Sequence, residues 1–298
     1  MKRIEANQVV YALSRENPPA ATADPGETLV FLTKDCFSNQ IQKETDLFAS
    51  VGWATINPAT GPVAVNGAEP GDTLAVEILD IEVAGQGSMI AVPGLGALSE
   101  QLTHSETKIV PIVNGKVIFN SELEIPIRPM IGVIGTAPAG QAVPCGTPGP
   151  HGGNMDTRFI GKGARLYLPV FAPGALLALG DLHAVMGDGE VVICGVEIPG
   201  QVTVKVDLIK AKAEPGPVLE TAEAWYTIAS APDLDEASQS ALQQMFAFIK
   251  RRIPLPPNEV AMLLSITGNL QISQVVDPLK TVRMEMPKWV LKAYGVKF

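Results

Sequence analysis

The sequence predicts a mainly β protein, with sandwich-like or barrel-like sheets and an α+β part at its C-terminal end. Three observations favour this class: 28 glycines and 25 prolines scattered along 298 residues, short apolar runs between them, and one amphipathic stretch near the end. Frequent glycine and proline mark turns between short strands, and proline interrupts helices. Hydrophobic residues make up 46% and charged residues 18%, so the chain can bury a large core and intrinsic disorder is excluded.

The first half of the chain shows strand patterns separated by turns. Residues 71–83 alternate apolar and polar side chains, but the phase slips by one position near Leu79, which predicts a bulge or a change of sheet. The glycine-rich stretch 85–96 is expected to be a loop. Residues 108–113 and 117–119 flank an Asn-Gly turn and are expected to form a hairpin.

The middle of the chain combines predicted strands with one long loop. Residues 130–135 are apolar on both faces, which is typical of a buried strand. Residues 136–163 have no periodicity and many glycines and prolines, and a loop of this length inside a domain is usually functional. Further strands are expected at 165–170, 191–198 and 201–208, the last with one face in solvent.

The C-terminal part mixes helices and strands. Residues 233–251 begin with acidic and end with basic side chains around an apolar stripe, which predicts an α-helix. A second helix is expected at 258–266, with Asn258 as its N-cap. Strands are predicted at 224–228, 270–276 and 281–286.

Three lobes are expected: an N-terminal β lobe over 1–100, a central β lobe over 101–212 that carries the candidate site, and an α+β lobe over 213–298. The best boundary is the Pro-Gly-Pro stretch at 213–217. Because nothing in the sequence resembles a flexible linker, we expect the lobes to form one compact unit.

Charge and hydropathy limit the partners and the location. The formal net charge is −9, so the chain is poorly suited to bind nucleic acid or an anionic membrane surface. The longest apolar stretch, residues 170–180, contains a proline and is too short to cross a bilayer. No export signal is recognisable, so we expect a cytoplasmic protein. The three widely spaced cysteines predict neither a disulfide framework nor a CxxC metal site.

Ionisable residues gather in the segment 180–190. Asp181 and His183 are two residues apart and would point to the same side of an extended chain. Asp188 and Glu190 repeat that spacing after a glycine. Apolar runs flank the segment, and burying charged groups is costly unless they serve a purpose. A solvated turn between two strands is the alternative interpretation.

These residue types could bind a divalent cation. Zinc commonly takes three protein ligands and a water, and His151, Asp181 and His183 offer suitable nitrogen and oxygen donors. Calcium requires several oxygen ligands. Four acidic residues could supply them: Asp156, Asp181, Asp188 and Glu190. The spacing alone does not decide between the two ions.

The segment His151-Gly-Gly-Asn-Met-Asp156 is the second candidate feature. Gly152 and Gly153 would let the backbone approach a ligand closely, and Asn154 could offer a hydrogen-bond donor. Such a loop could form an oxyanion hole. The alternative is a glycine turn that carries a surface histidine.

Two long motifs, at 151–156 and 180–190, resemble the acetamidase/formamidase family. Shorter similarities extend the resemblance over nearly the whole chain, at 34–37, 61–72, 128–135, 168–175 and 271–276. The resemblance implies a mainly β fold with an α/β C-terminal part, and hydrolysis of a short amide, formamide or acetamide, to a carboxylic acid and ammonia. It also implies a divalent metal, zinc or otherwise calcium, and a homo-oligomer, expected here as a homodimer.

Amide hydrolysis by a metal site requires ligands, a proton-transferring group and groups that hold the oxyanion. The hypothesis assigns the metal to His151, Asp181 and His183, with Asp156 and Asp35 as further candidate ligands. Glu190 is the expected general base and acid, and Asp188 supports it or competes for that role. The oxyanion is assigned to Asn154 and the backbone of Gly152 and Gly153.

Other interpretations remain open at this point. The chain could hydrolyse another small amide or an ester on the same scaffold, or it could be a β-rich binding protein without turnover. A thiol mechanism is a further alternative, in which Cys36 or Cys145 is a nucleophile paired with a histidine.

Overall fold

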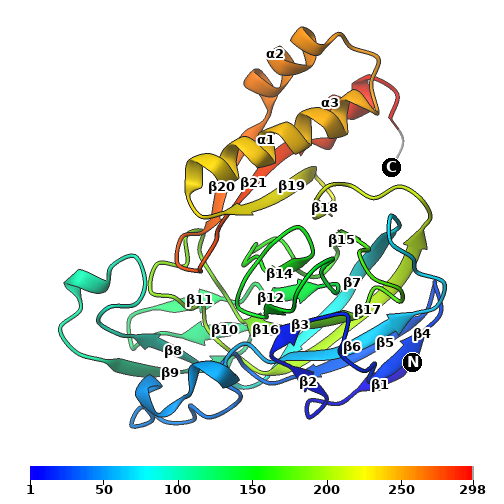
Figure 1. Cartoon of the computed structure of the whole chain (residues 1–298). Helices are drawn as coiled ribbons and strands as arrows, with labels where there is room; N and C mark the ends of the chain where they lie inside the picture. Colours follow the sequence, from blue (N-terminus) through cyan, green and yellow to red (C-terminus); the bar gives the residue numbers. More distant parts are fainter. Residues whose placement is uncertain (297–298) are drawn as a thin grey trace.

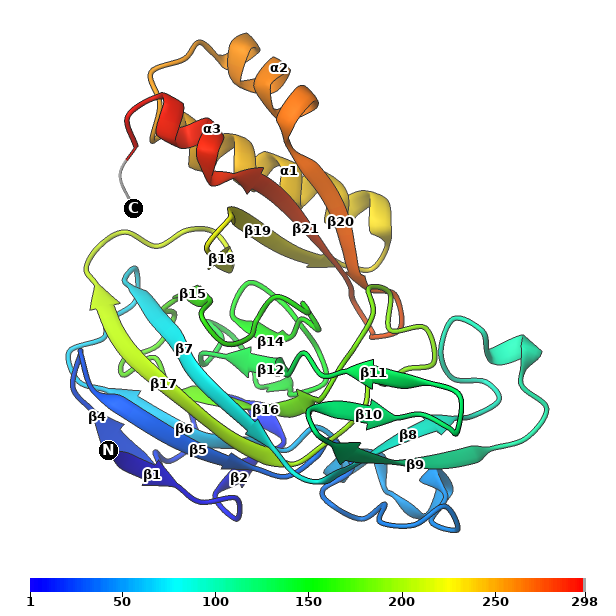
Figure 2. The ribbon, with the colours of Figure 1, turned by 180° about the vertical axis from the view of Figure 1, so that it is seen from behind.

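Two large β-sheets face each other in the computed structural model, which describes residues 1–296 (Figures 1 and 2). The larger sheet has nine strands, in spatial order β1 (Lys2–Ile4), β5 (Thr28–Thr33), β17 (Gly200–Ile209), β7 (Thr73–Val83), β15 (Arg165–Pro169), β18 (Val218–Glu220), β19 (Ala224–Ala231), β21 (Lys280–Pro287) and β20 (Asn269–Gln274). All of its strand pairs are antiparallel except that of β1 with β5.

The second large sheet carries most of the candidate site. Its strands run in the order β14 (Gly152–Asn154), β12 (Met130–Gly135), β16 (Leu177–His183), β6 (Ala59–Val65) and β2 (Val9–Val10), and β4 (Ala21–Ala23) pairs with β6. A smaller sheet lies to one side, in the order β11 (Glu124–Pro126), β10 (Lys116–Ile118), β9 (Glu106–Val113) and β8 (Gln86–Ala91). A short ladder joins β13 (Val143–Pro144) to β3 (Ala12–Leu13).

One hydrophobic core fills the space between the two large sheets. Phe31 and Leu74 from the nine-stranded sheet contribute to the same buried cluster as Ile131 and Leu179 from the second sheet. Each apolar side chain removed from water in this way stabilises the fold by about 1.5–3 kcal/mol. The core therefore holds the second sheet, and the polar residues at its edge, in a fixed position.

The C-terminal helices cover the far end of the nine-stranded sheet (Figure 1). Helix α1 (Leu234–Lys250) packs its buried stripe on β19 and β21. Asp233 caps it by accepting a hydrogen bond from the Glu236 backbone at 2.8 Å. Helices α2 (Pro257–Thr267) and α3 (Lys288–Ala293) flank the β20–β21 hairpin.

Most elements expected from the sequence are confirmed. The chain is mostly β with helices near its C-terminal end, and the strand and helix expected at 224–228 and 233–251 are present as β19 and α1. The phase slip near Leu79 is a bulge, since the pairing of β7 with β17 shifts register between Ile78 and Asp80 and leaves Leu79 exposed.

Other expectations are wrong, and tertiary pairing explains the first of them. Residues 86–91 form strand β8 rather than a loop, because they pair with β9 over six positions. Residues 191–198 form turns rather than a strand, and Ile193 has a φ of 79° that no extended strand allows. Helix α2 is present, but Asn258 does not cap it, since the N-cap position is Pro256. The predicted long loop 136–163 contains β13 and β14.

The nine-stranded sheet crosses all three predicted lobes. It takes β1, β5 and β7 from residues 1–100, β15 and β17 from 101–212, and β18 to β21 from 213–298. Across residues 1–296, the helices are all too short or too polar to span a bilayer.

Candidate functional site

Four buried carboxylates surround a buried histidine at one end of the second sheet. Asp181 and His183 lie at the end of β16, Asp156 follows β14, and Glu190 and Glu197 lie on the turns after β16. Each is at most 7% exposed. His183 Nε2 lies 3.0 Å from Glu197 Oε1, 3.6 Å from Asp181 Oδ1, 3.8 Å from Asp156 Oδ1 and 4.0 Å from Glu190 Oε1. We refer to these five residues as the carboxylate cluster.

Two glycines allow the cluster to form. A Cβ at Gly132 on β12 would lie 2.5 Å from Asp156 Oδ1 and 2.7 Å from Asp181 Oδ2. A Cβ at Gly195 would lie 2.7 Å from His183 Nδ1. Because real side chains do not tolerate such contacts, any other residue at either position would displace a member of the cluster.

The backbone of the cluster is strained at three positions. Asp156, Asp181 and Glu190 have φ angles of 42°, 56° and 51°. Non-glycine residues rarely adopt this left-handed conformation, which costs about 1–3 kcal/mol at each position. Such strain concentrates at functional sites, and it supports a role for these residues beyond packing.

Burial and mutual repulsion disturb the titration of the cluster. Burial, together with the charge of Asp277 and Asp181, raises the pKa of Asp156 well above its usual value. Burial and Asp156 do the same to the pKa of Glu190. Burial raises the pKa of Glu197 to about 7, although the neighbouring His183 opposes the shift. For His183, burial lowers the pKa, but the carboxylates of Glu197 and Asp181 outweigh it and the net shift is upward.

Several carboxylate oxygens of the cluster lack a hydrogen-bond partner within the described part of the chain. They are Asp156 Oδ1 and Oδ2, Asp181 Oδ1, Glu190 Oε2 and Glu197 Oε2. The second oxygen of Asp181 accepts a bond from Asn57 Nδ2 at 3.2 Å, and Glu197 Oε1 accepts one from the Gly195 backbone N–H at 3.0 Å. Buried charges without partners are costly, and a divalent cation among these oxygens would compensate them. The residues present therefore fit a cation.

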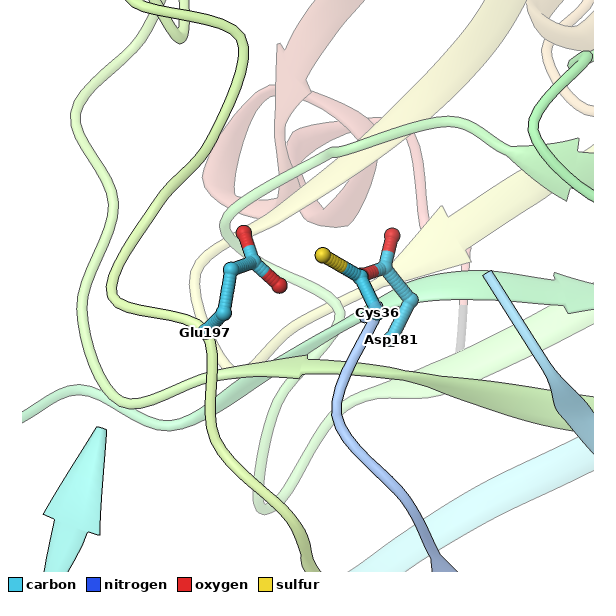
Figure 3. Close-up of side chains that lie close together, drawn as sticks. All are labelled: Cys36, Asp181 and Glu197. Atoms are coloured by element: carbon cyan, nitrogen blue, oxygen red, sulfur yellow. The ribbon is translucent and has the colours of Figure 1, made fainter. Parts of the chain in front are cut away.

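The donor atoms fall into two neighbouring sets. Asp156, His183 and Glu190 form one, and Cys36, Asp181 and Glu197 form the other, with the ligand atoms of each set within 4.8 Å of one another. Figure 3 shows the Cys36 sulfur and the carboxyl groups of Asp181 and Glu197 turned towards the same space. Nitrogen and sulfur donors suit zinc, whereas the oxygens alone would suit calcium.

A cavity of about 930 Å³ lies beside the cluster. Its polar lining includes Asn154, Asp181, Glu190, Glu197 and Asp277. Its apolar lining includes Phe37, Phe48, Trp53, Ile90 and Leu95. A concave, mostly apolar site with a few convergent polar groups is typical of a small-molecule site.

The structure brings four of the predicted site residues together, namely Asp156, Asp181, His183 and Glu190. It places His151 apart from both donor sets. His151 is nevertheless buried, its Nε2 has no hydrogen-bond partner among residues 1–296, and burial lowers its pKa to about 4. Asp35 also lies outside both sets. Its side chain accepts a hydrogen bond from the Asn39 backbone at 2.6 Å, and burial raises its pKa to about 6.

The predicted oxyanion loop has a different arrangement. Gly152 and Gly153 belong to β14 and pair with β12, and neither lines the cavity. Asn154 does line the cavity, but its Nδ2 donates to Asp277 Oδ2 at 2.9 Å. One of the two N–H donors of Asn154 is therefore already in use.

Asp188 lies outside the cluster and binds Arg283 of β21. Arg283 Nη1 and Nη2 donate to the two oxygens of Asp188 at 2.9 and 2.7 Å, and Arg158 lies 3.2 Å from Asp188 Oδ2. The Arg283 side chain is fully buried, whereas that of Asp188 is 32% exposed. The pair joins the Glu190 turn to the C-terminal hairpin.

Replacing Arg283 by leucine should destabilise the protein by about 2–4 kcal/mol. The range is set below the usual cost of breaking a buried ion pair because Asp188 is partly solvated. Urea unfolding would measure the change. Arg15→Leu is the control, since Arg15 is an exposed residue in an exposed ion pair and should cost less than about 0.5 kcal/mol. Equal stability of the two variants would contradict the expectation.

Two acidic residues of the site were not identified from the sequence. Glu197 is the single acidic residue in the apolar stretch 191–198. A lone acidic residue among apolar ones is costly to bury, so this pattern could have identified Glu197 as a site residue. Asp277 lies between two apolar residues and Pro278 in the β20–β21 turn, a pattern that any surface turn could have.

The fold and the site define a β-sandwich protein with a buried carboxylate–histidine centre beside a small-molecule cavity. A sequence model of the Acetamidase/Formamidase family matches residues 12–145 and 139–290. The chain therefore belongs to this family, as the motifs at 151–156 and 180–190 indicated.

Known relatives agree with this assignment. The crystal structure of an acetamidase from Bacillus halodurans is 49% identical and superposes with a TM-score of 0.97, covering 99% of this chain and 100% of that one. An acetamidase structure from Yersinia enterocolitica is 31% identical, with a TM-score of 0.93 over 97% of this chain and 92% of that one. The acetamidase of Mycolicibacterium smegmatis is 28% identical over 66% of this chain and 65% of its own length. The chain thus spans less than two thirds of this curated relative.

Proposed function

We propose that the chain hydrolyses a short aliphatic amide, formamide or acetamide, to the carboxylic acid and ammonia. The observation that carries this proposal is the group of buried, unpaired carboxylate oxygens around His183, beside a cavity with one polar and one apolar side. The family to which the chain belongs supports the amide as substrate class.

We further propose that a divalent cation, zinc or otherwise calcium, binds in the carboxylate cluster. Asp156, Asp181, His183 and Glu197 would hold it, with Cys36 as an additional ligand for zinc. When bound, such an ion polarises a carbonyl group and lowers the pKa of a water molecule. It would also offset the burial and the mutual repulsion that together raise the pKa values of Asp156 and Glu190.

Glu190 has the position and the environment of a general base. It lines the cavity, and its Oε2 is buried without a hydrogen-bond partner among residues 1–296. Burial and Asp156 raise its pKa above the usual value, which favours a carboxyl group that takes a proton from the attacking water and returns it to the departing nitrogen. The apolar wall, with Phe37, Phe48 and Trp53, would hold the acyl group.

Ammonia release from formamide and acetamide, with the metal content of the protein known, tests the proposal. Turnover of either amide would support it. If metal-loaded protein releases no ammonia but hydrolyses methyl acetate or a larger amide, the alternative hydrolase activity is correct. Binding of these compounds without turnover would favour a binding protein.

The expected homodimer and cytoplasmic location are separate proposals. Light scattering of the purified chain would test whether it is a homodimer.

Cys36→Ser separates a metal ligand from a nucleophile. Burial, with Glu197 and Asp181 nearby, raises the pKa of the Cys36 thiol, whereas a nucleophilic thiol requires a lowered one. We expect kcat at saturating zinc to fall less than about tenfold, and zinc affinity to fall about 10- to 100-fold.

Cys145→Ser is the matched control for this change. Cys145 is also buried, but it lies in a different cluster and its Sγ contacts the Val10 carbonyl at 3.4 Å. Burial raises its pKa to about 12. A loss of kcat of about a thousandfold or more in Cys36→Ser alone would instead support the thiol mechanism.

A further inference from the structure

We propose that Asp277 and Asn154 form an acceptor pair that binds the –NH₂ group of the substrate and restricts the site to primary amides. This inference rests on the proposed amidase function and adds a specificity determinant to it.

The loop between β20 and β21 brings Asp277 to the cavity. In both views this turn extends from the helical end of the molecule towards the sandwich (Figures 1 and 2). Val276, Asp277, Pro278 and Lys280 line the cavity, whereas its other lining residues come from the first 200 residues of the chain. The C-terminal part therefore supplies one wall of the site.

Hydrogen bonds from the buried Gln274 and from Lys280 hold this loop in one conformation. The fully buried Gln274 accepts from the backbone N–H groups of Val276 and Asp277 at 2.9 and 3.0 Å, and donates to the Leu279 carbonyl at 2.6 Å. Lys280 Nζ donates to the Asp277 carbonyl at 2.6 Å. Asp277 is therefore positioned before a substrate arrives, which is what a specificity determinant requires.

The contact with Asp277 fixes the orientation of the Asn154 side-chain amide. Asn154 Nδ2 donates to Asp277 Oδ2 at 2.9 Å, so the Asn154 amide presents Oδ1 elsewhere. That oxygen is buried and has no hydrogen-bond partner among residues 1–296, and Asn154 is 4% exposed. Both residues line the cavity. Two residues in contact at the cavity thus carry an unpaired amide oxygen and a carboxylate.

Acceptors on the wall select for donors on the ligand. The nitrogen of a primary amide carries two N–H donors, an N-methyl amide carries one, and an N,N-dimethyl amide or an ester carries none. A site that is built to bond a substrate N–H discriminates strongly against analogues that lack it, because its buried acceptors are then left unpaired. The acceptor pair matches the primary amide.

The position of the pair relative to Glu190 is consistent with this role. Gly189, the residue before Glu190, is bonded to the same hairpin: its N–H donates to the Ser273 carbonyl at 2.8 Å and its carbonyl accepts from Val275 at 3.2 Å. Glu190 and Asp277 both line the cavity. The amide nitrogen would be held by Asp277 and Asn154 on the side from which Glu190 delivers its proton.

The test compares wild type with Asp277→Asn on acetamide and methyl acetate, whose acyl groups are the same. We expect the variant to lose about 10- to 100-fold in kcat/KM for acetamide, the effect of leaving one buried hydrogen-bonding group unpaired, and less than about threefold for the ester. Wild-type kcat/KM should also fall from acetamide to N-methylacetamide to N,N-dimethylacetamide. In the variant, kcat/KM should differ less among these three amides.

Glu285→Gln is the matched control, since Glu285 is a carboxylate of the same hairpin that bonds Gln271 and lies outside the cavity lining. It should leave the ratio of amide to ester activity unchanged. Equal losses on both substrates in Asp277→Asn, or no loss, would overturn the acceptor pair. If that variant does not fold, Asn154→Leu provides the same comparison, because it removes the unpaired oxygen.

Calorimetric binding distinguishes failure of this inference from failure of the amidase proposal. If wild type turns over neither substrate, acetamide should still bind more tightly than methyl acetate, and Asp277→Asn should remove the difference. That result would retain the acceptor pair and reject the activity. Equal binding of amide and ester by wild type would reject the acceptor pair itself.

Discussion

Glu190→Gln should lower kcat for acetamide by about 100- to 10,000-fold, the usual contribution of general acid–base catalysis. Glutamine retains the size of the side chain but cannot accept the proton of the attacking water or return it to the leaving nitrogen. KM should change little, because the substrate contacts proposed for Asp277, Asn154 and the apolar wall remain. Ammonia release at saturating amide would measure the effect.

Asp188→Asn is the control for this prediction. It makes the same carboxylate-to-amide change two residues earlier in the turn, where the side chain binds Arg283 rather than facing the cavity. We expect it to retain most of the activity. A loss comparable to that of Glu190→Gln would make Asp188 the base, and full activity of folded, metal-loaded Glu190→Gln would reject Glu190.

Chelation should abolish amide hydrolysis and lower the melting temperature, and zinc should restore both. The cluster holds four carboxylates around one histidine, so removing a cation leaves buried like charges close together. A ligand present at 100 times its Kd stabilises the native state by about 2.7 kcal/mol. Calorimetric scans and ammonia release, on the same samples of known metal content, would measure the two effects.

His183→Gln should make the protein insensitive to chelation. The histidine is central to the cluster, and its removal should lower zinc affinity while the hydrophobic core between the sheets stays intact. Repeating the activity and melting measurements with calcium in place of zinc would test whether calcium is the bound ion. Full activity and an unchanged melting temperature after complete removal of divalent metal would reject the metal proposal, and the thiol mechanism at Cys36 would then be tested first.

Local patterns in the sequence determined much of the fold. The charge distribution and apolar stripe of 233–251 predicted helix α1, and the phase slip near Leu79 predicted the bulge between β7 and β17. These signals are readable because they depend on side chains a few residues apart. The spacing of Asp181, His183 and Glu190 indicated a site for the same reason, since all three lie within ten residues.

Contacts between distant segments decided what the sequence did not show. Strand β8 exists because it pairs with β9, despite a glycine-rich sequence typical of a loop. Asp188 resembled a site residue, yet it binds Arg283, which lies 95 positions further along the chain.

The residues of the site were likewise identified partly from local sequence patterns and partly from contacts between distant segments. The sequence by itself identified the family, the mainly β class and the segment that carries Asp181, His183 and Glu190. Only the tertiary structure added Glu197 and Asp277 and separated His151 from the donor sets. The physical reason is that a buried charge is defined by the groups that pack around it, and here those groups come from β-strands far apart in the sequence.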